Sequence, residues 1–395
     1  MDSVRPSRRP ANRRRQLVEL AADLFAQRGY QAVSIEDIAT AAGITGPALY
    51  RHFAGKQDLL AQVLLTGQET MDEAVEEALA GGGAPAGRLD AVVLALAELS
   101  VQRRGIAALW RWQARHLDEA ARNEVRQRGR KFIQRWAGEL ALARPELPAV
   151  DAELLCTAAL SVLGSVADHH ASLPKRRFVW LLAQLAGAVC ASTRVPAVAA
   201  EVVDATAPVT PSTRREQILA AATELFVQRG YRSVSMEDIG AAAGIAGPSV
   251  YRHFASKADL LMAGCGRLAD QLSLGASRAL SGAASPAEAL DRLIGSYVEV
   301  VMEHGELLHV YNRELAHLPE RNRQESLRIQ RAYVAQWVEL QVELSGATAP
   351  EAKIAVHAAL TIINDLSRSG RLRARPGFAA ELVGLAHDVL TPRRA

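Results

Sequence analysis

Two short segments, Gly46–Phe53 and Gly247–Phe254, combine a helix start with side chains that donate hydrogen bonds. The first reads GPALYRHF and the second reads GPSVYRHF. Proline suits the first turn of a helix, because the N–H that it lacks would have no partner there. Tyrosine, arginine and histidine then offer donors to an anion, and the free N–H groups of a helix start attract the same anion. Both segments are therefore candidates for contacting phosphates and the edges of DNA bases.

The residues before each segment predict the elements that would hold it. Apolar residues recur at helical spacing over residues 17–25, and Gly29 follows as a helix stop. Ser34 is a good N-cap for a second helix, with a carboxylate three residues on. A short turn with a glycine leads to a third helix, Ala48–Phe53, and a fourth begins near Lys56. Two short helices joined by such a turn predict a helix-turn-helix.

The whole arrangement occurs twice. Residues 14–60 align with residues 215–261 at an offset of 201 without a gap, and 29 of the 47 positions are identical. The correspondence continues beyond this region, where for example Trp136 meets Trp337. A repeat of this length exceeds the period of roughly 20–50 residues that is typical of solenoids, so it indicates a duplicated domain. Residues 193–213 contain three prolines and predict a semi-extended linker between the two units.

Composition limits the class of protein. A chain of 395 residues with 49% hydrophobic residues can form two or more folded domains. Six arginines crowd the stretch Arg5–Arg15 without an apolar run after them, which does not fit a secretory signal. No apolar run suggests a membrane span, which needs about 20 residues. The three cysteines lack metal or CxxC spacing, and this favours buried, reduced thiols in the cytoplasm and no metal site.

Spaced residues in both units resemble the N-terminal signature of the TetR family of transcriptional regulators. In each unit they follow the order LF, GY, VS, EDI, AGI, YRHF, K and DLL, and they cover roughly a quarter of the chain. The remainder, apolar helices with little motif content, is similar to that family's effector-binding domain. The resemblance implies an all-α fold of two tandem units, each with an N-terminal helix-turn-helix DNA-binding domain and a C-terminal helical effector-binding and dimerisation domain.

The implied organisation places a basic arm first and a linker between the units. The boundaries are 1–11 for the arm, 12–60 and 61–192 for the DNA-binding and effector domains of unit 1, 193–213 for the linker, and 214–261 and 262–395 for the two domains of unit 2.

The resemblance, with the basic residues ahead of each first helix, assigns DNA contacts position by position. In unit 1 they are Arg13, Arg14, Ser34, Thr45, Pro47, Ala48, Leu49, Tyr50, Arg51, His52 and Lys56. In unit 2 they are Arg214, Ser235, Pro248, Ser249, Val250, Tyr251, Arg252, His253 and Lys257. Unit 2 lacks the hydroxyl of Thr45, since Ala246 stands there, and has Ser249 for Ala48. The phosphate contacts are nearly retained while the base-facing residues change, so we expect related but unequal half-sites.

The bodies offer aromatic and histidine residues for an effector pocket. The candidates are Trp110, His116, Tyr311 and His317. Such pockets are mostly apolar with a few polar groups, so a largely apolar small molecule is expected and no cofactor is implied. A role for the two aromatics in the core is an equally open alternative. Neither the residues nor the resemblance identifies the effector.

The last helices of each unit are rich in small residues, as in Ala158-Ala159 and Ala358-Ala359. In the TetR family the equivalent helices form the dimer, so the two units are expected to pair within one chain as a pseudo-dimer. A homodimer with four DNA-binding heads is the competing arrangement. The function implied is a cytoplasmic repressor released from double-stranded operator DNA by its effector, with no membrane partner.

Two other classes of function compete with this one. An enzyme is disfavoured, because no nucleophile–base pair, paired-carboxylate motif or phosphate loop recurs between the units. The second is an adaptor-like regulator in which only the first head binds DNA and unit 2 is a structural or protein-interaction module. Ala246 and the thinner basic stretch at Arg214 and Arg215 keep this alternative open.

Overall fold

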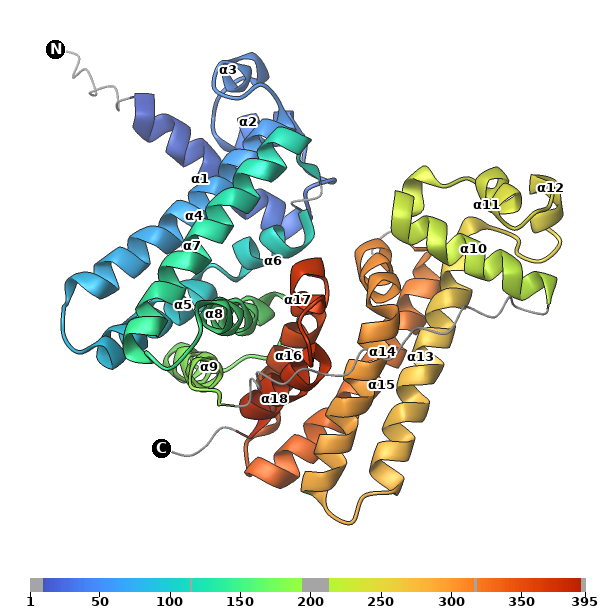
Figure 1. The fold of residues 1–395 in the computed structure, drawn as a ribbon. Coiled ribbons are helices and arrows are strands. Elements are labelled where there is room, and N and C mark those ends of the chain that lie inside the picture. The colour runs from blue at the N-terminus through green and yellow to red at the C-terminus, as the bar shows by residue number, and fades with distance from the viewer. Residues whose placement is uncertain (1–9, 114–115, 194–212, 316–317, 392–395) are drawn as a thin grey trace. The chain divides into compact units, whose positions relative to one another are not determined.

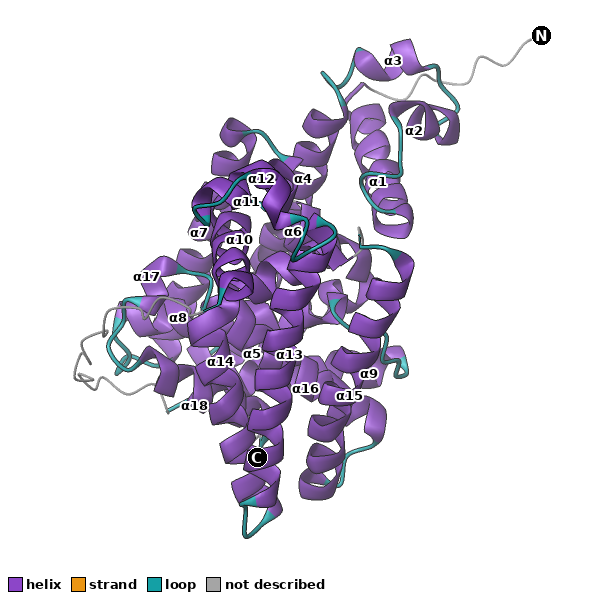
Figure 2. Ribbon diagram, turned by 90° about the vertical axis from the view of Figure 1, so that its right-hand side faces the viewer, coloured by secondary structure: helices purple, strands orange, loops and turns teal. Residues whose placement is uncertain are grey.

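The computed structural model describes residues 10–113, 116–193, 213–315 and 318–391, and all regular elements there are helices (Figure 2). The all-α prediction is thus confirmed. The chain divides into two compact units, residues 1–191 and 192–395. The predicted linker and basic arm lie almost wholly outside the described residues. In each unit a small DNA-binding candidate, here called the head, precedes a larger helical body.

Unit 1 begins with its head, from which α4 leads into the body (Figure 1). The head is formed by α1 (Pro10–Arg28), α2 (Ile35–Ala41), α3 (Gly46–Tyr50) and the start of α4 (Lys56–Ala80). The body contains the rest of α4 with α5 (Pro85–Gln102), α6 (Arg104–Gln113), α7 (Glu119–Ala143), α8 (Ala149–Gly164), the 3-10 helix η2 (Ser165–Ala167) and α9 (Lys175–Cys190).

Local sequence explains the helix boundaries of the head. Gly29 adopts a positive φ of 82°, which favours glycine after a helix end. Ser34 and Asp37 form the predicted capping box at the start of α2. The third helix is shorter and earlier than expected, since α3 ends at Tyr50, and Phe53 follows it as a buried anchor. These features hold α3 against a core that includes Phe25, Ile38 and Leu59, so the head has its own apolar interior.

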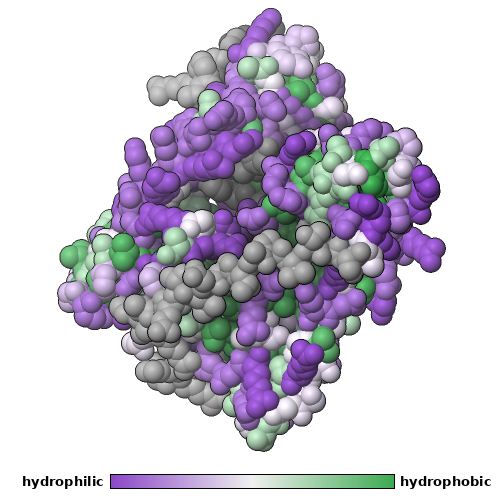
Figure 3. All heavy atoms as spheres, turned by 45° about the vertical axis from the view of Figure 1, so that its right-hand side comes forward, coloured by the Kyte–Doolittle hydropathy of each residue, from purple (hydrophilic) through white to green (hydrophobic). Residues whose placement is uncertain are grey.

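The body of unit 1 is organised around a buried helix. By length and composition alone, Ala149–Ala167 could cross a membrane, contrary to the expectation that no apolar run is long enough. In the structure 67% of this stretch is buried, and it packs between α7 and α9. A core helix of a soluble fold passes the same test, so the stretch is explained by packing. The face presented in Figure 3 is mainly hydrophilic, as expected when apolar helix faces turn inward.

Unit 2 repeats the plan. Its head contains α10 (Arg214–Arg229), the 3-10 helix η3 (Tyr231–Ser233), α11 (Met236–Ala242), α12 (Gly247–Val250) and the start of α13 (Lys257–Ser281). Its body adds α14 (Pro286–Glu314), α15 (Glu320–Ser345), α16 (Ala349–Leu366), α17 (Gly370–Arg373) and α18 (Phe378–Leu390). Buried Val250 and Phe254 anchor α12 to the head core, as their counterparts do in unit 1. All three cysteines of the chain are free and buried, as predicted.

One long helix is broken in unit 1 and continuous in unit 2. The residues of α14 run without interruption, whereas Arg103 leaves the helical conformation between α5 and α6. The next residue, Arg104, donates hydrogen bonds to the carbonyl oxygens of Val166 and His169 at the end of η2. Its counterpart at an offset of 201 is Gly305, which has no such side chain. This contact accompanies the break in unit 1 and has no counterpart at Gly305 in unit 2.

Candidate nucleic-acid interface

The recognition segments present large polar side chains to solvent. Tyr50 is 53% exposed and Tyr251 is 52% exposed, although tyrosine is a residue that usually buries much of its ring. Arg51 and Arg252 follow them and are also exposed, as are Pro47 and Pro248 at the helix starts. Each head thus exposes these predicted contact residues at or directly after its recognition helix. A partner at this face would meet donors from the side chains and from the helix start.

The two heads differ in the residue that precedes the recognition helix. Thr45 is the N-cap of α3, and its hydroxyl makes no capping hydrogen bond. It is exposed, so the hydroxyl remains available to an incoming phosphate. Ala246 occupies the same place before α12 and offers no such group. The hydroxyl of Ser249, which replaces Ala48, accepts a hydrogen bond from Arg252 at 3.3 Å.

Two of the predicted DNA contacts are buried in the free chain. The side chains of Leu49 and Val250 have no exposed surface, and each belongs to the apolar core of its head. They face inward because the helix is short and needs an apolar anchor one turn before Phe53 or Phe254. An apolar pair four residues apart is a sequence signal for the inner face of a helix, and it could have identified them.

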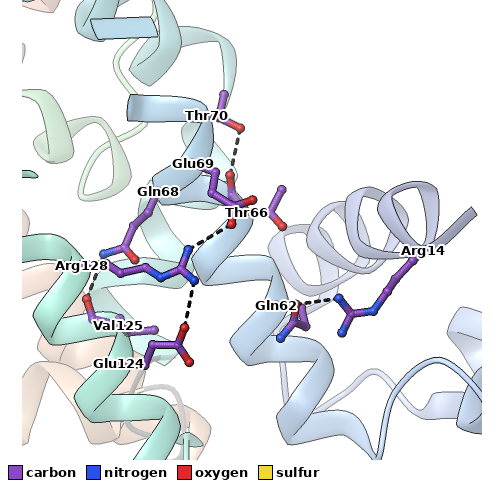
Figure 4. Close-up of polar contacts among 9 residues, drawn as sticks. All are labelled: Arg14, Gln62, Thr66, Gln68, Glu69, Thr70, Glu124, Val125 and Arg128. Carbon is purple, nitrogen blue, oxygen red and sulfur yellow. Dashed lines mark hydrogen bonds and ion pairs between the residues drawn. The ribbon is translucent and has the colours of Figure 1, made fainter. Parts of the chain in front are cut away.

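The arginines ahead of the recognition helices bind their own heads. Arg13 donates to the carbonyl oxygen of Ala42 at 2.8 Å, and Arg214 donates to that of Ala243 at 3.2 Å. These carbonyls lie at the ends of α2 and α11, where helix carbonyls lack partners. Arg14 lies over the ring of Phe53 and donates to Gln62 on α4 (Figure 4). The three predicted DNA contacts therefore also brace the helix-turn-helix.

Ser34 and Ser235 have their hydroxyls committed to capping. Each hydroxyl donates to the carboxylate three residues on, at 2.7 Å to Asp37 and 2.6 Å to Asp238, and accepts from the backbone N–H of the same aspartate. Hydrogen bonds from the serine side chain and backbone hold the pKa of both aspartates below the usual range. The helix starts are thereby stabilised in the same way in both heads.

Lys56 and Lys257 direct their ammonium groups toward the protein. Lys56 Nζ lies 4.4 Å from the ring centroid of Tyr30 and donates to the carbonyl oxygen of Gln31. Lys257 Nζ lies 4.6 Å from the ring of Tyr231 and donates to the carbonyl of Val234 at 2.8 Å. Burial lowers the pKa of both lysines. For a phosphate, the backbone N–H groups at the starts of α4 and α13 are the better oriented donors.

Comparison with known proteins matches both heads to one family. The family model described as "Bacterial regulatory proteins, tetR family" matches residues 17–63 and 218–263. A second model, "Tetracyclin repressor-like, C-terminal domain", matches residues 283–368. The chain is a tandem member of the TetR family. Both matches to the N-terminal model include the recognition helix and its exposed tyrosine, so the two TetR units share the same candidate interface.

Individual relatives match parts of the chain. The HTH-type transcriptional repressor KstR2 of Mycolicibacterium smegmatis is 31% identical over 110 residues, which are 28% of this chain and 54% of the relative. KstR2 of Rhodococcus jostii is 30% identical over 33% of this chain and 64% of its own. The transcriptional activator FasR of M. smegmatis is 45% identical over 17% of this chain and 31% of its own. Each match spans less than two thirds of the relative's length.

Among solved structures, a TetR-family transcriptional regulator from Bordetella parapertussis 12822 is 20% identical to this chain. The match covers 46% of this chain and 97% of that chain, with a TM-score of 0.43.

In the first TetR unit, contacts that the sequence did not predict join two helices of the body, α4 and α7. Arg128 on α7 donates to Glu69 on α4 at 3.0 Å and to Glu124 at 2.9 Å (Figure 4). The side chain of Gln68, buried beside them, donates to the carbonyl oxygen of Val125 at 3.0 Å. These contacts fasten α7 to the helix that leads directly from the head. The contacts of Arg128 with Glu69 and of Gln68 with Val125 join residues 59 and 57 positions apart, and no local pattern marks them.

Of the predicted effector residues, the structure describes the side chains of His116 in unit 1 and Tyr311 in unit 2. His116 stacks on Tyr30 with ring centroids 4.8 Å apart and contacts Gln31, so it lies at the junction of head and body. Tyr311 packs against the core of the second head, and burial raises its pKa. The side chain of Trp110 and all of His317 lie outside what the structure describes.

Proposed function

We propose that this chain is a sequence-specific DNA-binding transcriptional regulator and not an enzyme, with two heads that contact one double-stranded operator. The observation that carries the proposal is the exposed tyrosine–arginine pair beside a helix start, which occurs at the same site in both heads. Exposed donors and helix N-termini suit phosphate contacts, and a short helix with small residues at its start suits the major groove. Binding DNA would place the chain in the cytoplasm.

The two half-sites are proposed to be related but unequal. The phosphate-contacting residues are the same in both heads, since Tyr50-Arg51-His52 corresponds to Tyr251-Arg252-His253. The residues at the helix starts differ, with Thr45 and Ala48 replaced by Ala246 and Ser249. Phosphate contacts set orientation and base contacts set sequence preference, so this pattern favours one shared docking geometry with two preferences.

Separate replacement of Tyr50 and Tyr251 by alanine tests whether both heads bind DNA. Each is expected to weaken binding to the operator by roughly five- to a hundredfold, as loss of one or two hydrogen bonds to charged phosphates does. The measurement is the dissociation constant of the full chain for a duplex enriched from a random pool. Both side chains are exposed, so neither variant should change the unfolding temperature.

The alternative, an adaptor in which only head 1 binds DNA, predicts a different outcome. Tyr50→Ala would then weaken binding, whereas Tyr251→Ala would leave the dissociation constant within twofold of the original. Ala246, which lacks a hydroxyl at a phosphate-facing position, is the observation that favours this alternative.

Regulation by a largely apolar small molecule is part of the proposal. The matched relatives include proteins named as a repressor and as an activator, and repression relieved by an effector is the form we propose. An effector lowers operator affinity only as far as it prefers the conformation whose heads are misaligned. The measurement is displacement of operator duplex by candidate apolar molecules. Trp110 and Tyr311 stay as proposed effector contacts. Trp110→Ala should abolish displacement without changing DNA affinity, whereas Tyr311→Ala also removes packing against the core of the second head.

We also propose that the two TetR units pair within one chain as a pseudo-dimer. The presence of two complete units in one chain, each ending in helices rich in alanine, supports this arrangement. Light scattering of the purified chain is expected to give a single-chain mass near 42.5 kDa. Twice that mass would favour a homodimer with four heads, and paired operators would then be sought.

A further inference from the structure

The two heads differ at one buried position beneath the recognition helix. Ala39 in α2 corresponds to Gly240 in α11, and both are buried. Each residue accepts the same backbone hydrogen bond from the turn, from Ile44 at 3.0 Å and from Ile245 at 2.9 Å. The turn is therefore the same in both heads, and the missing methyl group is the local difference between the two positions.

The space at Gly240 is filled by backbone of the recognition helix. A Cβ atom on Gly240 would lie 2.9 Å from both Cα and N of Gly247, and 3.0 Å from the carbonyl oxygen of Ile245. These are atoms of the backbone, which cannot rotate away as the end of a side chain can. A methyl group at residue 240 therefore requires the start of α12 to move away from α11.

The first head shows the looser arrangement. Ala39 carries a Cβ atom at the matching position, and α3 accommodates it. A Cβ on Gly46 would meet only Glu36 Oε1 at 3.9 Å, whereas a Cβ on Gly247 would meet Cα and Cγ of Glu237 at 3.1 Å. Two close approaches, both at Gly247, thus indicate that α12 lies nearer to α11 than α3 lies to α2.

We propose that Gly240 is a positioning residue that sets the sequence preference of the second head. This rests on the proposed DNA-binding function. The first residues of α11 are tied to Ser235, a candidate phosphate contact, by the capping box. Drawing α12 toward α11 shifts Pro248 and Ser249, the proposed base contacts, relative to Ser235. In the first head, which has Ala39, the residues at the helix start lie at a different distance from the phosphate contact. Exchanging the base-facing residues alone therefore does not exchange the sequence preference of the two heads.

A transplant into the first head tests this, because Gly240→Ala could simply unfold the second head. Head 1 of the full chain receives the residues of head 2 by Thr45→Ala and Ala48→Ser at the helix start and by Leu49→Val at the buried core position below them. A second variant adds Ala39→Gly, which creates no clash. A matched control adds instead Ala21→Gly, which removes a methyl group from a buried alanine of α1. Thermal unfolding confirms that each variant is folded.

The readout is preference between two duplexes. Duplexes are selected from a random pool with the original chain, with Tyr50→Ala and with Tyr251→Ala. The half-site that each variant no longer selects belongs to the head that carries the substitution. One duplex then carries both original half-sites, and the other carries the second head's half-site twice. The variant with Ala39→Gly is expected to favour the second duplex by about tenfold, as discrimination of one base pair allows. The triple variant and the Ala21→Gly control are each expected to favour the second duplex over the first by less than about threefold.

Two results would overturn the proposal and separate it from its premise. If the triple variant already favours the second duplex as strongly, or if Ala39→Gly adds no more than Ala21→Gly, Gly240 does not set preference although the second head binds DNA. If selection with the original chain yields no half-site that depends on Tyr251, the two-headed function fails, and the role of Gly240 falls with it.

Discussion

Raising monovalent salt from about 50 mM to about 200 mM is expected to weaken operator binding by about a thousandfold. A protein that contacts six or more phosphates releases their counterions, and log affinity then falls linearly with log salt concentration. Each head offers an exposed arginine, Arg51 or Arg252, an exposed tyrosine, and helix starts. Two heads together supply enough groups for that number of phosphates. The measurement is the dissociation constant across a salt series with the selected duplex.

Charge removal in one head at a time provides the control. Arg51→Ala and Arg252→Ala should each reduce the magnitude of the salt slope by about one and weaken binding to all sequences alike. Glu36 is exposed on the first head and carries a negative charge, so it is a matched control site. Glu36→Ala should not reduce the magnitude of the salt slope. If Arg252→Ala leaves the slope unchanged while Arg51→Ala reduces it, the second head does not contact DNA.

Replacing Phe53 by alanine is expected to lower the free energy of unfolding of the first head by about 3–5 kcal/mol. Phe53 is only 2% exposed and joins the end of the recognition segment to the core, with the guanidinium of Arg14 5.1 Å from its ring centroid. Its loss leaves a cavity in a small core, so the position of α3 is lost with it. Denaturant unfolding of the full chain, followed together with operator binding, measures both effects.

The neighbouring residue and the other head supply the comparisons. Arg51→Ala changes an exposed side chain beside Phe53, so its effect on stability should stay within about 0.5 kcal/mol. Phe254→Ala should destabilise the second head by a similar amount to Phe53→Ala, since Phe254 is buried and Arg215 lies over its ring. Unfolding curves that match the original chain would mean that neither phenylalanine anchors its recognition helix.

Much of the candidate DNA-binding face follows from the sequence. The sequence places Tyr50 and Tyr251 on the recognition helix as phosphate contacts, and both side chains are exposed there. Leu49 and Val250 received their predicted contact role from the family resemblance, whereas their own chemistry is apolar and the structure places both in the head cores. The signature identifies a segment, whereas the direction of each side chain depends on which face of a short helix meets the core.

The sequence by itself determined the duplication, the all-α class and the helix starts of both heads. Capping residues, glycines after helix ends and apolar periodicity act within a few positions, so they can be recognised without distant partners. The capping boxes at Ser34 and Ser235 are of this kind, and both formed as predicted.

Only the tertiary structure decided what depends on residues far apart in the chain. The arginine pair Arg13 and Arg214 binds carbonyls 29 positions away, and His116 stacks on a ring 86 positions before it. The close approach of α12 to Gly240 is likewise a matter of backbone packing, which leaves no periodic or compositional trace. These contacts arise when helices pack, because close packing brings together atoms that sequence order keeps apart.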